Sequence, residues 1–72
     1  MKNFHDYYFG LPVRERDGYC QRAGTTVKYA ERLAGGWRLP SLRMAKHLID
    51  ASRGEISFHS LIATYESRNG PL

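Results

Sequence analysis

Apolar residues recur at helical spacing along the chain, in five short segments that glycine and proline residues separate. The first segment, 2–9, and the last, 57–67, have the plainest i, i+3, i+4, i+7 period, which predicts an amphipathic helix in each. The segments between them cover 12–23, 26–34 and 41–53. The residues in the two plain periods are Phe4, Tyr7, Tyr8 and Leu11, and Phe58, Leu61, Ile62 and Tyr65. The pattern therefore predicts an all-α domain of five short helices.

The three middle segments have less regular apolar stripes, which we expect to face the core. Gly18 lies inside the second segment, where glycine costs about 1 kcal/mol relative to alanine and weakens the helix prediction. Residues 55–59 alternate between polar and apolar, so a short strand or hairpin is the alternative there to a helix capped by Ser57. The expected inward residues are Val13, Arg16, Cys20 and Ala23 with Tyr19 beside them, then Tyr29, Ala30 and Leu33, then Leu42, Ala45, Leu48 and Ile49 with Met44 alongside.

Helix boundaries follow from capping residues. Gly24 suits a left-handed helix end, and Thr26 can cap the helix that follows it. The pair Gly35-Gly36 stops that helix, and Ser41 after Pro40 can cap the next one. The middle of the chain is therefore predicted to form a helix, a tight glycine turn, a short helix, a loop and a new helix.

Composition bounds the class of protein. The 72 residues are enough for one domain, 1–72, and the 42% hydrophobic and 25% charged content is that of a globular protein. No apolar run approaches the roughly 20 residues of a membrane span, and no apolar leader is expected at the N-terminus. A lone cysteine, Cys20, predicts a reduced, buried thiol in a cytoplasmic protein. The net charge of +4 suits a surface that contacts phosphates.

The sequence offers little for covalent chemistry. His5, His47 and His59 have no metal-ligand spacing, and no acidic cluster accompanies them. No nucleophile, acid and base can be grouped from their spacing, and Gly35-Gly36 lacks the Lys-Ser/Thr that follows a phosphate loop. We therefore expect no catalytic residues, no metal, no cofactor and no small-molecule ligand.

The order of helix, glycine turn, short helix and Gly-x-Arg-x-Pro-Ser exit resembles the Cro-like helix-turn-helix family of phage and bacterial repressors. The resemblance covers about 12–53 well and the flanking residues loosely. Cys20 stands where the family usually has alanine, and Ala30 where it usually has a larger aliphatic residue. The residues that carry the resemblance are Gly24-Thr25-Thr26, Val27 to Leu33, and Gly36-Trp37-Arg38-Leu39-Pro40-Ser41.

The resemblance implies that the helix at about 26–34 enters the major groove of double-stranded DNA. It places the family's base-reading residues at Val27, Lys28 and Arg32. Arg32 can donate two hydrogen bonds to guanine, Lys28 can reach the same acceptors, and Val27 can pack on a thymine methyl group. Glu31 can accept from cytosine or orient Arg32. The alternative is that this face is simply solvated.

A second set of residues is expected to contact DNA phosphates, which position a protein without reading sequence. Helix N-termini favour anions, and the resemblance implies that the loop after the recognition helix runs along the DNA backbone. For Trp37, the alternative is a partly buried anchor between the third and fourth helices. The candidates are Arg16, Thr26, Tyr29, Trp37, Arg38 and Ser41.

The family commonly binds pseudo-palindromic operators as two-fold dimers, so we expect a homodimer on DNA, acting as a transcriptional repressor. Its place would be the cytoplasm of a bacterial or phage-infected cell, at the nucleoid. The alternative is an antitoxin-type or other protein-interaction module, with DNA binding secondary or absent. The expected dimer surface, within the C-terminal segment at about 55–68, is Phe58, Leu61, Ile62 and Tyr65. The same residues could instead belong to the monomer core.

Overall fold

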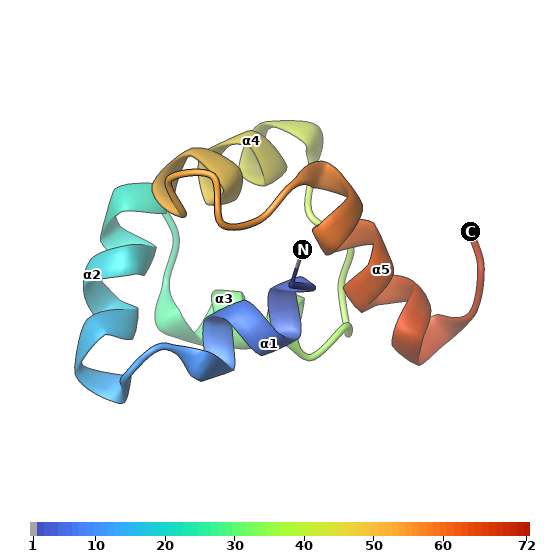
Figure 1. Ribbon diagram of the computed structural model, residues 1–72, viewed down its shortest axis with the longest axis horizontal. Helices are drawn as coiled ribbons and strands as arrows, with labels where there is room; N and C mark the ends of the chain where they lie inside the picture. The colour runs from blue at the N-terminus through green and yellow to red at the C-terminus, as the bar shows by residue number, and fades with distance from the viewer. Residues whose placement is uncertain (1) are drawn as a thin grey trace.

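The computed structural model describes residues 2–72 and contains, over that range, five helices and no strand (Figure 1). The all-α prediction is therefore confirmed. The alternating stretch 55–59 does not form a strand, because Ser57 caps a helix that begins at Phe58. The helices are α1 (Phe4–Gly10), α2 (Val13–Ala23), α3 (Val27–Ala34), α4 (Leu42–Ala51) and α5 (Phe58–Asn69).

Side-chain caps define where four of the helices begin. The Asn3, Thr26, Ser41 and Ser57 side chains each accept a hydrogen bond from the backbone N–H three residues later. In α5 the Ser60 hydroxyl also accepts from the Ser57 N–H, which completes a capping box. Three of the four caps were predicted from sequence, and the cap at Asn3 was not.

The five helices enclose one aromatic-rich core. In Figure 1, α2 lies at the left, α4 across the top and α5 at the right, while α1 lies in front of α3 along the lower edge. Phe4 and Tyr8 of α1 are fully buried, and both rings pack near the buried Tyr19 ring of α2. The Phe4 N–H donates to Thr64 Oγ1 at 2.8 Å, which joins the start of α1 to α5. In this arrangement α3 packs against α1, α2 and α5.

Two residues predicted to face the core are exposed instead. Val13 is 75% exposed because it occupies the first position of α2, one turn before the half-buried Arg16. Leu42 is 74% exposed although it lies in the same i, i+3 row as the buried residues of α4. Each step of three residues along a helix falls about 60° short of a full turn. The buried row Ala45, Leu48 and Ala51 therefore drifts around α4, and Leu42 lies on its flank.

Candidate nucleic-acid interface

The turn between α2 and α3 is closed by Gly24. Its φ of 75° is left-handed, and its N–H donates to the Gln21 carbonyl while the Thr25 N–H donates to the Cys20 carbonyl at 2.9 Å. This pair of bonds is the usual ending of a helix at a left-handed glycine. The Thr26 hydroxyl then accepts from the Tyr29 N–H at 3.1 Å. Backbone and cap bonds together define how α3 leaves α2.

One face of α3 is buried and the opposite face is open. Ala30, Leu33 and Ala34 are at most 2% exposed and form part of the core. Lys28 and Arg32 are exposed, and within residues 2–72 neither side chain makes an ion pair or a hydrogen bond. Their charges are therefore available to a partner.

The other two predicted base-contacting residues differ from each other. Glu31 is exposed and forms no ion pair with its neighbour Arg32 in the described part of the chain. Val27 is half-buried and packs partly against the core, so only part of its side chain faces outward. The outer surface of α3 is thus formed mainly by Lys28, Glu31 and Arg32.

The loop after α3 turns at a second left-handed glycine. Gly36 has a φ of 79°, its N–H donates to the Leu33 carbonyl, and the Trp37 N–H donates to the Arg32 carbonyl at 3.0 Å. This places Trp37 beside Arg32, and the two residues line a shallow depression of about 440 Å³. Trp37 is 64% exposed, so the larger part of its side chain faces outward.

Helix α5 holds this loop from the other side. Arg68 Nε donates to the Gly35 carbonyl and Asn69 Nδ2 to the Gly36 carbonyl, both at 2.8 Å. The Arg68 guanidinium lies 3.6 Å from the centre of the Trp37 ring. Sequence reasoning missed Arg68, because a residue 33 positions from its partner gives no periodic or motif signal.

The remaining predicted phosphate contacts are divided between exposed and engaged side chains. Thr26, Arg38 and Ser41 are exposed, and Tyr29 is half-buried. Thr26 and Ser41 already use their hydroxyl oxygens as caps, although each hydroxyl hydrogen can still donate. These residues lie around the start of α3, the following loop and the start of α4.

Arg16 differs from these residues because its side chain is held by its own fold. Its Nε donates to the Leu11 carbonyl at 3.2 Å and its Nη2 to the Phe9 carbonyl at 3.1 Å. The guanidinium also lies 5.6 Å from the ring centre of Tyr8 and 5.5 Å from that of Phe9. The structure therefore gives Arg16 a structural role at the α1–α2 connection that the sequence did not indicate.

The predicted dimer surface requires one correction. Leu61 is 3% exposed and belongs to the core, so its side chain is not available on a surface. Ile62 and Tyr65 are half-buried, and Phe58 is 43% exposed. Leu61 is buried because α5 packs this face against the body of the molecule. The helical period of α5 could not distinguish such a core face from a dimer surface.

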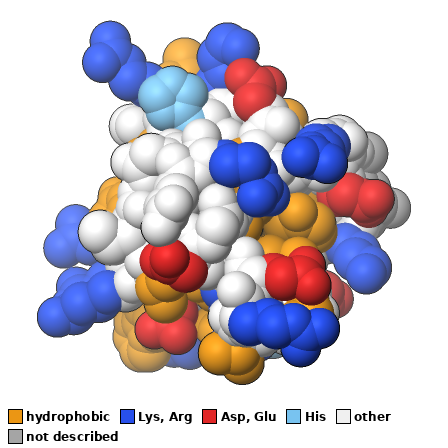
Figure 2. Space-filling view, turned by 90° about the vertical axis from the view of Figure 1, so that its left-hand side faces the viewer, with side chains coloured by type: hydrophobic (Ala, Val, Ile, Leu, Met, Phe, Trp, Pro, Cys, Tyr) orange, Lys and Arg blue, Asp and Glu red, His pale blue; other side chains and the backbone are white. Residues whose placement is uncertain are grey.

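Positive charge is not gathered over α2. Figure 2 views this side of the molecule, where Lys and Arg side chains project among interspersed Asp and Glu side chains. Such mixed charge does not produce a field of one sign. The net charge of +4 therefore gives no reason to place a DNA surface over α2.

Residues 2–72 hold no group of three or more His, Cys, Asp or Glu side chains arranged to bind a metal ion. Cys20 is a buried free thiol, and burial raises its pKa above the ordinary 9.0. Its Sγ lies 3.7 Å from the Tyr8 hydroxyl. Among the described helices, none has the length and apolar character needed to cross a bilayer.

Comparisons of the chain with protein-family models, with curated proteins and with solved structures found no match.

Proposed function

We propose that the protein binds double-stranded DNA in a sequence-specific way, with α3 in the major groove. The observation that carries the proposal is the pair Lys28 and Arg32, exposed and unpaired within residues 2–72 on a helix whose opposite face is buried. A major groove about 12 Å wide admits one α-helix. A helix supported in this way presents its side chains from a rigid base, which specific readout requires.

The chemistry of the outer face suits base edges. Arg32 can donate two hydrogen bonds to O6 and N7 of guanine, and Lys28 can donate to the same acceptors or to a phosphate. Glu31 can accept from the amino group of cytosine, and the exposed part of Val27 can contact a thymine methyl group. The four residues thus offer two donors, one acceptor and one apolar contact.

Phosphate contacts are proposed on either side of this reading face. Thr26 lies at the N-terminus of α3 and Ser41 at that of α4, where free backbone N–H groups favour an anion. Arg38 is exposed in the loop between the two helices. These contacts would set the orientation of α3 without reading sequence.

We further propose that two copies bind together, through an apolar groove between the starts of α4 and α5. Leu39, Leu42, Phe58 and Leu72 are 44%, 74%, 43% and 71% exposed, and they line one groove of about 290 Å³. An exposed apolar cluster of this kind marks an interaction surface. A second copy is the occupant that the DNA proposal needs, because one short helix contacts few bases and pairing multiplies specificity. Bound at an operator, such a dimer would act as a repressor.

The experiment that tests DNA binding starts from a pool of random duplexes. The wild-type protein is used to select bound sequences, and its affinity for a selected duplex and a scrambled one is measured by fluorescence anisotropy at several salt concentrations. We expect the selected duplex to bind on the order of 10³-fold more tightly or better, with affinity falling as salt rises. Equal affinity for both duplexes, or no enrichment, would contradict the proposal.

A protein-interaction module is the second candidate function, and the same apolar groove favours it. In that case the groove would take a different protein, and Lys28 and Arg32 would be solvated. The duplex selection separates the two candidates, because only the DNA proposal predicts enrichment of a sequence.

A further inference from the structure

The contact between Arg68 and Trp37 creates a cationic group fixed on the protein surface. The guanidinium lies 3.6 Å from the centre of the indole ring, and its Nε donates to the Gly35 carbonyl at 2.8 Å. A cation over the face of tryptophan is attracted by the ring, and the hydrogen bond restrains its rotation. The Arg68 side chain is therefore ordered in advance, unlike most exposed arginine side chains.

The fixed guanidinium still has donors to offer. An arginine carries five N–H groups, and the bond to Gly35 uses one of them. The two terminal NH₂ groups make no hydrogen bond or ion pair with residues 2–72. Their planar fork matches two oxygens of a phosphate group. The group is thus held by one edge and open at the other.

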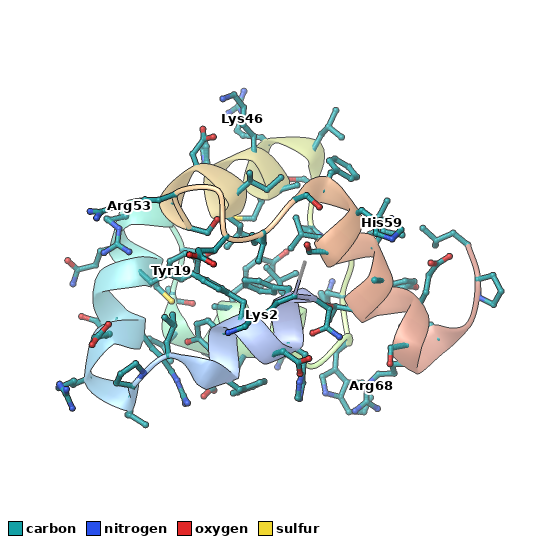
Figure 3. All side chains as sticks on the ribbon, in the orientation of Figure 1. Lys2, Tyr19, Lys46, Arg53, His59 and Arg68 are labelled. Carbon is teal, nitrogen blue, oxygen red and sulfur yellow. The ribbon has the colours of Figure 1, made fainter. Side chains whose placement is uncertain are left out.

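The position of this group relates it to the reading face of α3. Arg32 ends the row of exposed charged residues on α3, and it shares a surface depression with Trp37. Trp37 in turn carries Arg68 on its ring. Arg32, Trp37 and Arg68 are therefore neighbours on the surface, and they connect α3 with the end of α5. In Figure 3, Arg68 lies at the lower right, far from Lys46 at the top and Arg53 at the upper left.

We propose that Arg68, held against Trp37, binds a backbone phosphate of the same duplex that α3 reads. The inference rests on the proposed function and extends the DNA interface from the helix-turn-helix region onto α5. Arg68 lies beyond the C-terminal end of α3, whereas the residues proposed to read bases lie along α3 itself. We therefore expect Arg68 to contact a phosphate rather than a base. Trp37 positions the guanidinium and Arg68 supplies the charge.

The test compares two substitutions that each remove one positive charge. Arg68→Gln is expected to reduce the slope of log affinity against log salt by about one, while the ratio of selected to scrambled affinity stays as in the wild type. Arg53→Gln, at the far edge of the molecule in Figure 3, is the matched control and is expected to leave the slope unchanged. Equal slopes for Arg68→Gln and the wild type would overturn the inference.

A second variant distinguishes a purely structural role of Arg68 from a phosphate contact. Arg68→Lys keeps the charge but loses the planar fork and the bond from Nε. If Arg68 acts through phosphate, Arg68→Lys keeps most of the salt slope even where its melting temperature falls. If Arg68 only clamps the loop, both variants lower the melting temperature equally and neither changes the slope, which would overturn the inference.

Failure of the proposed function and failure of the Arg68 contact give different results. A wild-type protein that enriches no duplex refutes both proposals. A wild-type protein that binds a selected duplex, together with an Arg68→Gln variant of unchanged slope, refutes only the contact from α5.

Discussion

The Tyr19 hydroxyl donates a 2.7 Å hydrogen bond to the Leu48 carbonyl, 29 residues further along the chain. This bond joins α2 to α4 inside the core, where both residues are at most 1% exposed. Tyr19 is labelled in Figure 3. Helix α2 leads into the turn at Gly24, so the bond also supports the base from which α3 projects. The fold and the proposed reading face thus depend on the same buried contacts.

Removing this hydroxyl should lower stability by a moderate amount. We expect Tyr19→Phe to reduce the free energy of unfolding by about 1 kcal/mol, measured by urea denaturation. The loss is moderate because the Leu48 carbonyl also accepts from the Ser52 N–H at 3.2 Å and is not left without a partner. Tyr7→Phe is the control, since the Tyr7 hydroxyl has no hydrogen-bond partner among the described residues. An equal effect of the two substitutions would contradict this account.

The two left-handed glycines of the interface should respond differently to alanine. Gly24→Ala places a side chain in open space, so it should cost about 1 kcal/mol for the left-handed backbone alone. At Gly36 the new Cβ would lie 2.9 Å from the Thr64 carbonyl oxygen and 3.1 Å from Arg68 Cβ. We expect Gly36→Ala to cost about 3 kcal/mol, because α5 must move away from the loop. Thermal unfolding of both variants gives the comparison, and equal losses would show that α5 does not pack on Gly36.

Stability should decrease at alkaline pH. Burial raises the pKa of Tyr8 and Tyr19 above the ordinary 10.0, and that of Cys20 above 9.0. The folded protein then keeps protons that the unfolded chain releases, so stability is full below about pH 9 and falls as pH rises through the folded values. Urea denaturation from neutral to strongly alkaline pH should show a flat region followed by a decline. Stability that rises in the alkaline range would contradict these burial effects.

The C-terminal dimer surface is tested by a charge in the apolar groove. Leu42→Glu should keep the protein folded, because an acidic residue at the first position of α4 suits the helix N-terminus. Sedimentation velocity on a duplex carrying two half-sites should then show two wild-type copies bound but one copy of the variant. Val13→Glu is the matched control, equally exposed and also first in its helix. Two bound copies of Leu42→Glu would exclude this groove as the contact.

Local signals predicted most of the helix boundaries. Gly24, Thr26, Ser41 and Ser57 act within three or four residues of their own position, so the sequence contains the whole interaction. The inner and outer faces of α3 were predicted for the same reason, since a helical period separates them. Val27 is the exception, because it was expected on the outer face and packs partly against the core. This part of the candidate site therefore follows from short-range patterns in the sequence.

Contacts between different structural elements do not follow from such patterns. The stacking of Arg68 on Trp37 and the engagement of Arg16 by the Phe9 and Leu11 carbonyls depend on how helices meet. The same holds for Leu61, because periodicity identifies an apolar face but not whether that face packs inside one chain or between two. The way the helices and loops pack against one another thus decided each of these roles.

The central claim is that Lys28 and Arg32 read the bases of a DNA duplex. The most direct measurement compares the affinity of a Lys28→Gln/Arg32→Gln variant for the selected and scrambled duplexes with that of a Lys46→Gln/Arg53→Gln variant, which loses the same charge at the opposite edge. Each reading residue is expected to contribute about 1–3 kcal/mol of discrimination, so the first variant should lose most of its preference while the second keeps it. A Lys28→Gln/Arg32→Gln variant that retains the full preference for the selected duplex would contradict the account.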